Sequence, residues 1–136
     1  MANVTAVQLI EDGPRHAVIK VTATLDTADV AALVIADPAT LIGMDNTGLV
    51  KAKKFRVKLL DYNVPDGFAV NLFWQATAPV MIVALNGVGE NDYTYFGGIP
   101  DNSGAGSTGA ITLSTLGWVA AAVRSFSVVL VLTKQA

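Results

Sequence analysis

The 136-residue sequence contains no cysteine, only one histidine and few charged residues. Without cysteine, zinc-thiolate sites, cysteine nucleophiles and disulfide frameworks are excluded. A single histidine also excludes a metal site built from three histidines. Charged residues make up 15% of the chain, where about 25% is usual, and the formal net charge is −2. This balance gives no overall attraction to nucleic acid or to anionic lipid.

Long uncharged apolar runs are missing as well. Residues 116–133 form the longest candidate, but Arg124, Ser125 and Ser127 interrupt it, so it does not fit a membrane-spanning helix of about 18 or more apolar residues. The first residues carry neither a basic segment nor a long apolar stretch, which predicts no signal peptide. We expect synthesis in the cytoplasm and no membrane partner.

Apolar residues are in excess. They make up 52% of the chain, and the twelve glycines raise the figure to about 61%, against about 45–50% in ordinary soluble domains. The length fits one domain spanning residues 1–136. One domain of this size has to place the excess in a rich core or on surfaces that other subunits cover, and we favour covered surfaces and therefore a homo-oligomer.

Two-residue alternation of apolar and polar side chains runs through most of the chain and predicts an all-β protein. Between Arg15 and Leu25, for example, five apolar residues share one parity, and the other parity is polar with a single Val18. Eight strands are expected, at residues 4–10, 15–25, 51–64, 68–75, 80–88, 93–96, 110–114 and 123–133. Within 51–64, the pattern puts Phe55, Val57 and Leu59 on the face opposite Lys54, Arg56 and Lys58. The strand at 80–88 is apolar at both parities, which predicts a central strand that is covered on both faces.

The connections support the same fold class. Residues 11–14 contain Gly and Pro and predict a turn, and Val64-Pro65-Asp66-Gly67 predicts a hairpin that pairs 51–64 with 68–75. Residues 30–36 fit a short helix or a strand, and Asp37-Pro38 predicts one short helical turn. We predict an antiparallel β-sandwich, jelly-roll-like, with a barrel as the alternative.

Residues 104–109 spell G-x-G-x-x-G, which resembles a dinucleotide-binding loop. Such a loop follows a strand, opens a helix and has an acidic residue about 20 residues later. Here the motif leads into a strand-like segment, no acidic residue follows Asp101, and no lysine follows Gly109. We interpret it as a flexible surface loop.

The titratable residues show no diagnostic spacing for catalysis or metal binding. His16 lies on the polar side of its predicted strand, without a nucleophile elbow elsewhere in the chain, and is interpreted as a surface or interface residue. Two acids across a cleft would be needed for a glycosidase, and residues 90–92 with 101–102 offer oxygens for calcium, but neither set has the required pattern. We expect no enzymatic activity and no cofactor.

The basic residues gather in one strand, because Lys51, Lys53, Lys54, Arg56 and Lys58 are five of nine in the chain. Lys54, Arg56 and Lys58 share one face, spaced about 6.6–7 Å apart. This face is either exposed to solvent or lies on an edge strand that its charges protect from pairing with other chains. The other interpretation is that it docks onto an acidic surface of another protein. Nucleic acid is disfavoured, since no stacking aromatics alternate with these residues.

The aromatic residues supply further candidates. Phe68, Phe73 and Trp74 share one predicted strand at mixed parity, so at least one faces away from the core, and we take Phe73 and Trp74 as partner-binding candidates with Lys54, Arg56 and Lys58. A sugar-binding platform is the other possible use of aromatic residues, which here are Trp74, Trp118, Tyr93, Tyr95 and Phe96.

Four stretches carry a resemblance to a known class of proteins: residues 1–18, residues 45–54, Tyr95-Phe96-Gly97-Gly98 and Thr115-Leu116-Gly117-Trp118. In their order these features resemble small structural proteins of tailed bacteriophages, of the head decoration or cement type. The resemblance implies a β-sandwich subunit, often a trimer, that sits on the capsid of the virion and binds the major capsid protein or other virion proteins. It assigns no role to any individual residue.

The leading hypothesis is therefore a non-enzymatic virion protein that stabilises a phage head. Burial of apolar area across several partners at once would supply its binding energy. The alternative is a carbohydrate- or receptor-binding sandwich of a phage tail or fibre, with residues 93–109 as the binding loop. A small hydrolase is a third possibility.

Overall fold

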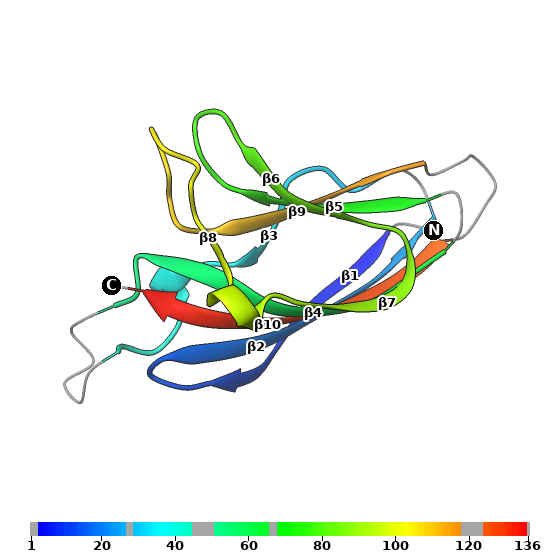
Figure 1. Ribbon diagram of the computed structural model, residues 1–136. Coiled ribbons are helices and arrows are strands. Elements are labelled where there is room, and N and C mark those ends of the chain that lie inside the picture. Colours follow the sequence, from blue (N-terminus) through cyan, green and yellow to red (C-terminus); the bar gives the residue numbers. More distant parts are fainter. Residues whose placement is uncertain (1–2, 27–28, 45–50, 66–67, 118–123, 136) are drawn as a thin grey trace.

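A computed structural model describes residues 3–26, 29–44, 51–65, 68–117 and 124–135. These residues form two antiparallel β-sheets stacked as a sandwich, which confirms the predicted fold class (Figure 1). The strands are β1 (Val4–Asp12), β2 (His16–Leu25), β3 (Leu33–Ala36), β4 (Lys54–Val64), β5 (Ala69–Trp74), β6 (Val80–Leu85), β7 (Gly87–Asp92), β8 (Ile99–Pro100), β9 (Ile111–Leu116) and β10 (Arg124–Gln135). Two 3-10 helices, η1 (Pro38–Thr40) and η2 (Thr94–Phe96), complete the described part.

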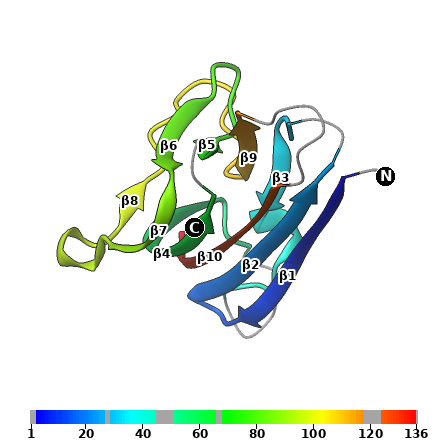
Figure 2. The ribbon, with the colours of Figure 1, turned by 90° about the vertical axis from the view of Figure 1, so that its right-hand side faces the viewer.

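The larger sheet has the order β1-β2-β10-β4-β7, with the short β8 pairing with β4. The smaller sheet has the order β3-β9-β5-β6. Figure 2 shows the two layers, with β1 at one margin of the larger sheet and β7, β8 and η2 at the other. None of the described residues belongs to a helix long and apolar enough to cross a membrane.

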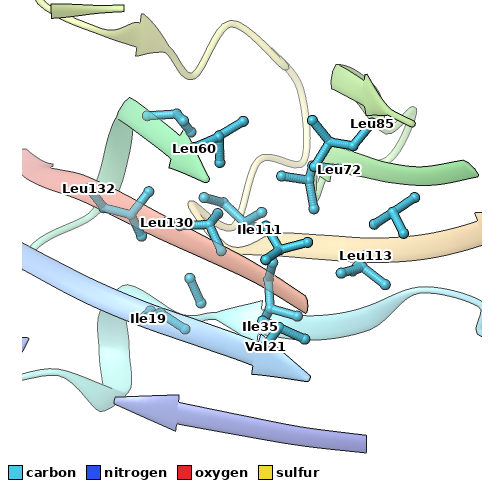
Figure 3. Packing of buried hydrophobic residues seen from close by; sticks show 14 of the residues in the cluster. Ile19, Val21, Ile35, Leu60, Leu72, Leu85, Ile111, Leu113, Leu130 and Leu132 are labelled. Carbon is cyan, nitrogen blue, oxygen red and sulfur yellow. The ribbon is translucent and has the colours of Figure 1, made fainter. Parts of the chain in front are cut away.

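The core lies between the sheets and follows the alternation of the sequence. In β2 the residues at odd positions from Ala17 to Leu25 are buried, and in β10 Phe126, Val128, Leu130 and Leu132 are buried in the same way. Leu60, Leu72, Ile111 and Leu113 meet them from β4, β5 and β9 (Figure 3). Each sheet therefore turns one face to the core, as expected of a sandwich, and on the outer face of the smaller sheet Asn71 and Thr112 are buried as well.

The alternation of β4 changes at a β-bulge. Val131 of β10 pairs with Leu59, but the next residue, Leu132, pairs with Val57, so Lys58 is the extra residue. Beyond the bulge the buried position is Leu60, which is fully enclosed, and Leu59 is only half-buried. The prediction that Leu59 lies on the same face as Phe55 and Val57 is wrong, because one inserted residue shifts the parity of everything after it.

The predicted hairpin between residues 51–64 and 68–75 is also wrong. β4 pairs with β10, β7 and β8 in one sheet, whereas β5 pairs with β6 and β9 in the other. The chain between them crosses from sheet to sheet, and Asp66 and Gly67 lie outside the described residues. A Pro-Asp-Gly signal predicts a reversal of direction, but it does not decide whether the next strand joins the same sheet.

Residues 80–88 form parts of two strands instead of one central strand. β6 ends at Leu85 on the margin of the smaller sheet, and β7 begins at Gly87 on the margin of the larger one. Gly87 has a φ of +80°, which lets the chain turn sharply between the layers. This division, β3 and β8 add three strands, and residues 93–96 form no strand, so the described residues hold ten strands where eight were expected.

Residues 30–40, part of which fits either a short helix or a strand by sequence, contain both a strand and a helical turn. Residues 33–36 form β3, and η1 follows directly. The Asp37 carboxylate accepts a hydrogen bond from Ala39 N at 3.0 Å, with Pro38 at the first helical position. The helical turn predicted at Asp37-Pro38 is confirmed.

Candidate binding surface beside β4

The row of basic residues on β4 faces outward. Lys54 is exposed and Arg56 and Lys58 are half-buried, while Phe55 and Val57 between them are fully buried. β4 is an inner strand with β10 on one side and β7 and β8 on the other, so the suggestion that the charges protect a sheet edge is wrong. Their role as partner contacts stays a prediction.

Residues 92–98 form a tight turn next to this row. The Asp92 carboxylate accepts hydrogen bonds from Thr94 N at 2.8 Å and from Thr94 Oγ1 at 2.6 Å. These two bonds lower the pKa of Asp92. Gly97 N donates to Thr94 O, and Gly98 N donates to Tyr93 O at 3.0 Å. The prediction of a strand at 93–96 is therefore wrong. The hydrogen bonds to Asp92, together with Gly97 and Gly98 after the helix, stabilise this segment as η2 instead.

The turn carries two exposed aromatic rings, and a third, Tyr93, is half-buried against the core. Tyr95 is 85% exposed and Phe96 is 48% exposed. Their rings meet edge to face with centroids 4.7 Å apart, and the Tyr93 ring lies 6.1 Å from that of Phe96. Burial raises the pKa of Tyr93, and the neighbouring Tyr62 and Tyr95 act in the same direction against a hydrogen bond with Asn91. The tyrosine hydroxyl is therefore neutral at physiological pH.

Close contacts fix the turn against β4. Arg56 Nη1 donates to Gly98 O at 3.2 Å, and Tyr93 N donates to Lys58 O at 2.8 Å. A Cβ on Gly98 would lie 2.9 Å from Val57 O, and the φ of Gly98 is +96°, so only glycine lets the backbones approach this closely. Arg56 also pairs with Pro100 of β8. The structure thus brings the predicted basic row and the exposed aromatic residues together.

We call this region the aromatic-basic surface, which consists of Lys54, Arg56, Lys58, Tyr93, Tyr95 and Phe96. All six residues are candidates from the sequence alone, but there they form two separate groups, one basic and one aromatic. The hydrogen bond that joins the groups links residues 42 positions apart, and no local pattern predicts it. The Tyr-Phe-Gly-Gly stretch was the available signal, since two glycines after two aromatics favour a turn.

The two candidates on β5 have different positions. Phe73 is half-buried on the outer face of the smaller sheet, where it pairs with Met81 and Thr112, and it stays a candidate contact. Trp74 is 1% exposed and is part of the core. Its proposed role in partner or sugar binding is a wrong prediction, because the inward parity of Val70 and Leu72 continues to Trp74. Trp118 lies outside the described residues.

The glycine-rich loop at residues 104–109 is mostly exposed, but its backbone is hydrogen-bonded to the rest of the protein. Thr108 N donates to Gln75 O at 3.1 Å, and a Cβ on Gly109 would lie 1.9 Å from Lys53 O. The loop leads into β9 and opens no helix, as the sequence predicts. Gly106 and Gly109 allow close backbone packing, whereas Gly104 has no atom within 4 Å of an added Cβ, and the flexibility expected of the loop stays a prediction.

The remaining titratable candidates have local partners. His16 Nε2 lies 2.6 Å from Glu11 Oε1 at the surface. Asp101 accepts hydrogen bonds from Ser103 and Ser107. Across the described ranges, no group of three or more His, Asp or Glu residues is placed to hold a metal ion. A hollow of about 220 Å³ beside Asn63, Ser125 and Phe126 is smaller than the roughly 300–1,000 Å³ of ordinary ligand pockets.

Sequence reasoning missed a buried ion pair. Lys134 continues the inward parity of β10, and its side chain is fully buried. Lys134 Nζ donates to Asp12 Oδ1 at 2.5 Å and to Ile42 O at 3.1 Å, and Asp12 Oδ2 accepts from Ile42 N. The pair links β1 to β10 at one end of the core. The position of Lys134 in an otherwise apolar series was the signal for it.

Comparisons with known proteins give no further guide: no protein-family model, no curated protein and no solved structure matches the chain.

Proposed function

We propose that the protein is a non-enzymatic structural subunit of a tailed-phage virion, of the capsid decoration or cement type, which binds an acidic area of the major capsid protein. The observation that carries the proposal is Tyr95, which is 85% exposed although its backbone segment is tightly hydrogen-bonded. The assignment to a virion rests on the resemblance of the sequence to phage structural proteins. The aromatic-basic surface provides the side chains for the proposed contact with the capsid protein.

The aromatic-basic surface has the composition of a protein contact. Tyrosine and arginine are enriched among the residues that contribute most to binding, and a rigid backbone lowers the entropy lost on association. Lys54, Arg56 and Lys58 attract an acidic partner and exclude a basic one. On a capsid the same contact is repeated over many copies, and each copy gains when it touches more than one capsid subunit.

Co-sedimentation with capsids that lack the protein tests the proposal. The wild type should sediment with such capsids and raise their resistance to heat, whereas Tyr95→Ala and Lys54→Glu should each weaken binding at least about tenfold, as expected of central contacts. Val88→Ala and Lys20→Glu are matched controls, since they change an exposed apolar residue and a basic residue on other strands. Absence of wild-type binding, or equal loss in the controls, would contradict the proposal.

A second candidate function is glycan binding, and the exposed ring of Tyr95 favours it as a stacking platform for the apolar face of a sugar. A glycan array separates the two functions. Binding to one glycan class that is lost in Tyr95→Ala, without any binding to capsids, would favour a receptor-binding role on a tail or fibre. Binding to capsids without glycan binding favours decoration.

We also propose the jelly-roll form of the sandwich. Four nested strand pairs support it: β2 with β10, β3 with β9, β4 with β7, and β5 with β6. Nested pairs of this kind arise when one long hairpin folds over itself into two four-stranded sheets. β1 and β8 are then additions at the margins.

A further inference from the structure

β1 forms an open margin of the larger sheet. Seven of its nine residues are exposed, among them Val4 at 66%, Val7 at 43%, Leu9 at 50% and Ile10 at 58%. No charged residue occurs between Val4 and Ile10. Soluble proteins usually protect such an edge with charges, proline, a β-bulge or a very short strand, and the one irregularity of β1 lies at Ile10, at the end of this uncharged segment. The opposite margin, β7, carries a charge within the strand at Glu90, whereas the charges of β1, Glu11 and Asp12, lie at its last two positions.

The inner face of β1 is left partly uncovered as well. Val7 pairs with Val21 and Leu9 with Ile19, so both point to the same side as buried core residues. They line a groove of about 140 Å³ that Ile35 and Leu41 close from the other side. Apolar side chains therefore line both the edge and the groove beside it.

We infer that β1 is the contact for a second copy of this chain, which pairs with it as an antiparallel strand around a two-fold axis at Val7. Residues that face each other across an antiparallel pair must lie on the same side of a continuous sheet. The register at Val7 meets this condition. It places Val7 opposite Val7, Thr5 opposite Leu9 and Ala6 opposite Gln8, and it brings Val4 to the irregularity at Ile10, so the exposed apolar residues meet uncharged neighbours.

Other registers fit less well. A shift of one residue places inner side chains opposite outer ones, as any one-residue slip does. A shift of the axis to Gln8 places two glutamines at the centre and Asp12 opposite Val4. A shift to Leu9 places Glu11 opposite Val7. An axis at Ala6 also avoids charges, but it places Val4 opposite Gln8 and Leu9 opposite Asn3, so the axis at Val7 brings together the most apolar residues.

The charge distribution is compatible with this partner. Lys20, next to Gln8 on β2, would lie about 15 Å or more from its symmetry mate, and the two Glu11 residues about 26 Å apart, given the usual strand spacings. Both distances exceed the screening length of about 8 Å at physiological salt. Two copies with a net charge of −2 each can therefore approach along this edge without opposed like charges.

This contact is independent of the proposed function. Figure 2 shows β1 and the turn with η2 at opposite margins of the larger sheet. A pair formed through β1 leaves the aromatic-basic surface of both copies open. It is also a closed dimer, because two-fold pairing occupies the β1 edge of both copies, whereas the resemblance to decoration proteins implies a trimer.

The first test is the solution mass of the full chain by sedimentation velocity from about 1 µM to about 1 mM, the range of weak homodimers. Wild type should approach twice the mass of one chain, and Val7→Lys should weaken dimerisation at least tenfold because two lysines would meet at the axis. Val88→Lys, a matched change at a 79% exposed position on β7, should dimerise like wild type. A monomer throughout, a trimer, or equal loss in Val88→Lys would overturn the inference.

The second test reads the register and does not depend on the stability of a charged variant. The chain has no cysteine, so Val7→Cys introduces a single thiol that should form an intermolecular disulfide under mild oxidation. Thr5→Cys and Leu9→Cys should crosslink with each other when mixed, and neither should crosslink efficiently alone. Val88→Cys is the control. Dimers in which Val7→Cys crosslinks no faster than Val88→Cys would show that another surface is used.

Discussion

Two parts of the larger sheet expose apolar side chains, and they are held in place by different means. The turn at residues 92–98 is fixed by short-range hydrogen bonds to Asp92 and by contacts to β4. β1 is fixed by its pairing with β2 and by the ion pair between Asp12 and Lys134, which are 122 positions apart. Both regions therefore combine a local frame with a contact to a distant part of the chain, but the distant contact of the turn is a hydrogen bond to a carbonyl oxygen, whereas that of β1 is a buried ion pair. The comparison teaches that the loss of the distant contact should cost more stability at β1 than at the turn.

The largest expected effect follows from breaking the anchor of β1. Asp12→Ala leaves the buried ammonium of Lys134 without its carboxylate, and such a loss costs about 3–5 kcal/mol. Urea unfolding measures this change in the free energy of unfolding. The double variant Asp12→Leu with Lys134→Met is the control, and it should return close to wild-type stability because no buried charge remains. A loss below about 1 kcal/mol for Asp12→Ala would contradict the role of the pair.

The same anchor predicts how stability depends on pH. Burial alone raises the pKa of Asp12, but the hydrogen bonds from Lys134 and Ile42 and the charges of Lys134 and Lys51 outweigh it, so the pKa lies below 3.8. The unfolded chain then binds the proton first, so the contribution of Asp12 is complete above its unfolded pKa and is lost as the pH falls through the lower folded value. Urea unfolding from pH 7 to pH 2 should show wild type and Asp12→Asn converging in acid. Parallel curves would contradict this.

A smaller effect tests the scaffold of the turn. Gly98→Ala adds a Cβ 2.9 Å from Val57 O at a positive φ, and backbone strain of this kind costs about 1–3 kcal/mol. Gly87→Ala is a matched control, because Gly87 also has a positive φ but has no atom within 4 Å of the added Cβ. Thermal unfolding of both variants separates the close approach from the conformational strain. Equal losses would show that the contact with β4 does not hold the turn.

Local patterns in the sequence predict most strands correctly, because alternation reports which face of a strand is buried. They succeed for β2 and β10, where all inward positions are apolar except Lys134. They fail at Lys58, where an inserted residue reverses the parity, and at Leu85 to Gly87, where the chain changes sheets within an apolar run. Both failures depend on pairing between distant strands, which periodicity does not contain.

In the aromatic-basic surface, too, alternation predicts some features, and others depend on pairing between distant strands. The outward direction of Lys54 and Arg56 follows from alternation, and the burial of Trp74 would have followed from the parity of Val70 and Leu72. The position of the aromatic turn beside Arg56 depends on the pairing of β4 with β8, which consists of only two residues. A strand of that length has no recognisable sequence pattern.

The smallest expected effect on stability is at Tyr95, at the tip of the turn. It can be compared directly with the effect of a substitution on β1. Tyr95→Ala removes a ring that is 85% exposed, so the free energy of unfolding should change by no more than about 0.5 kcal/mol. Leu9→Ala on β1 removes a side chain that borders the core and should cost more, about 1 kcal/mol. Calorimetry of the two variants measures this order. If Tyr95→Ala is the more destabilising, the ring supports the fold of the turn, and its exposure no longer argues for a contact with a partner.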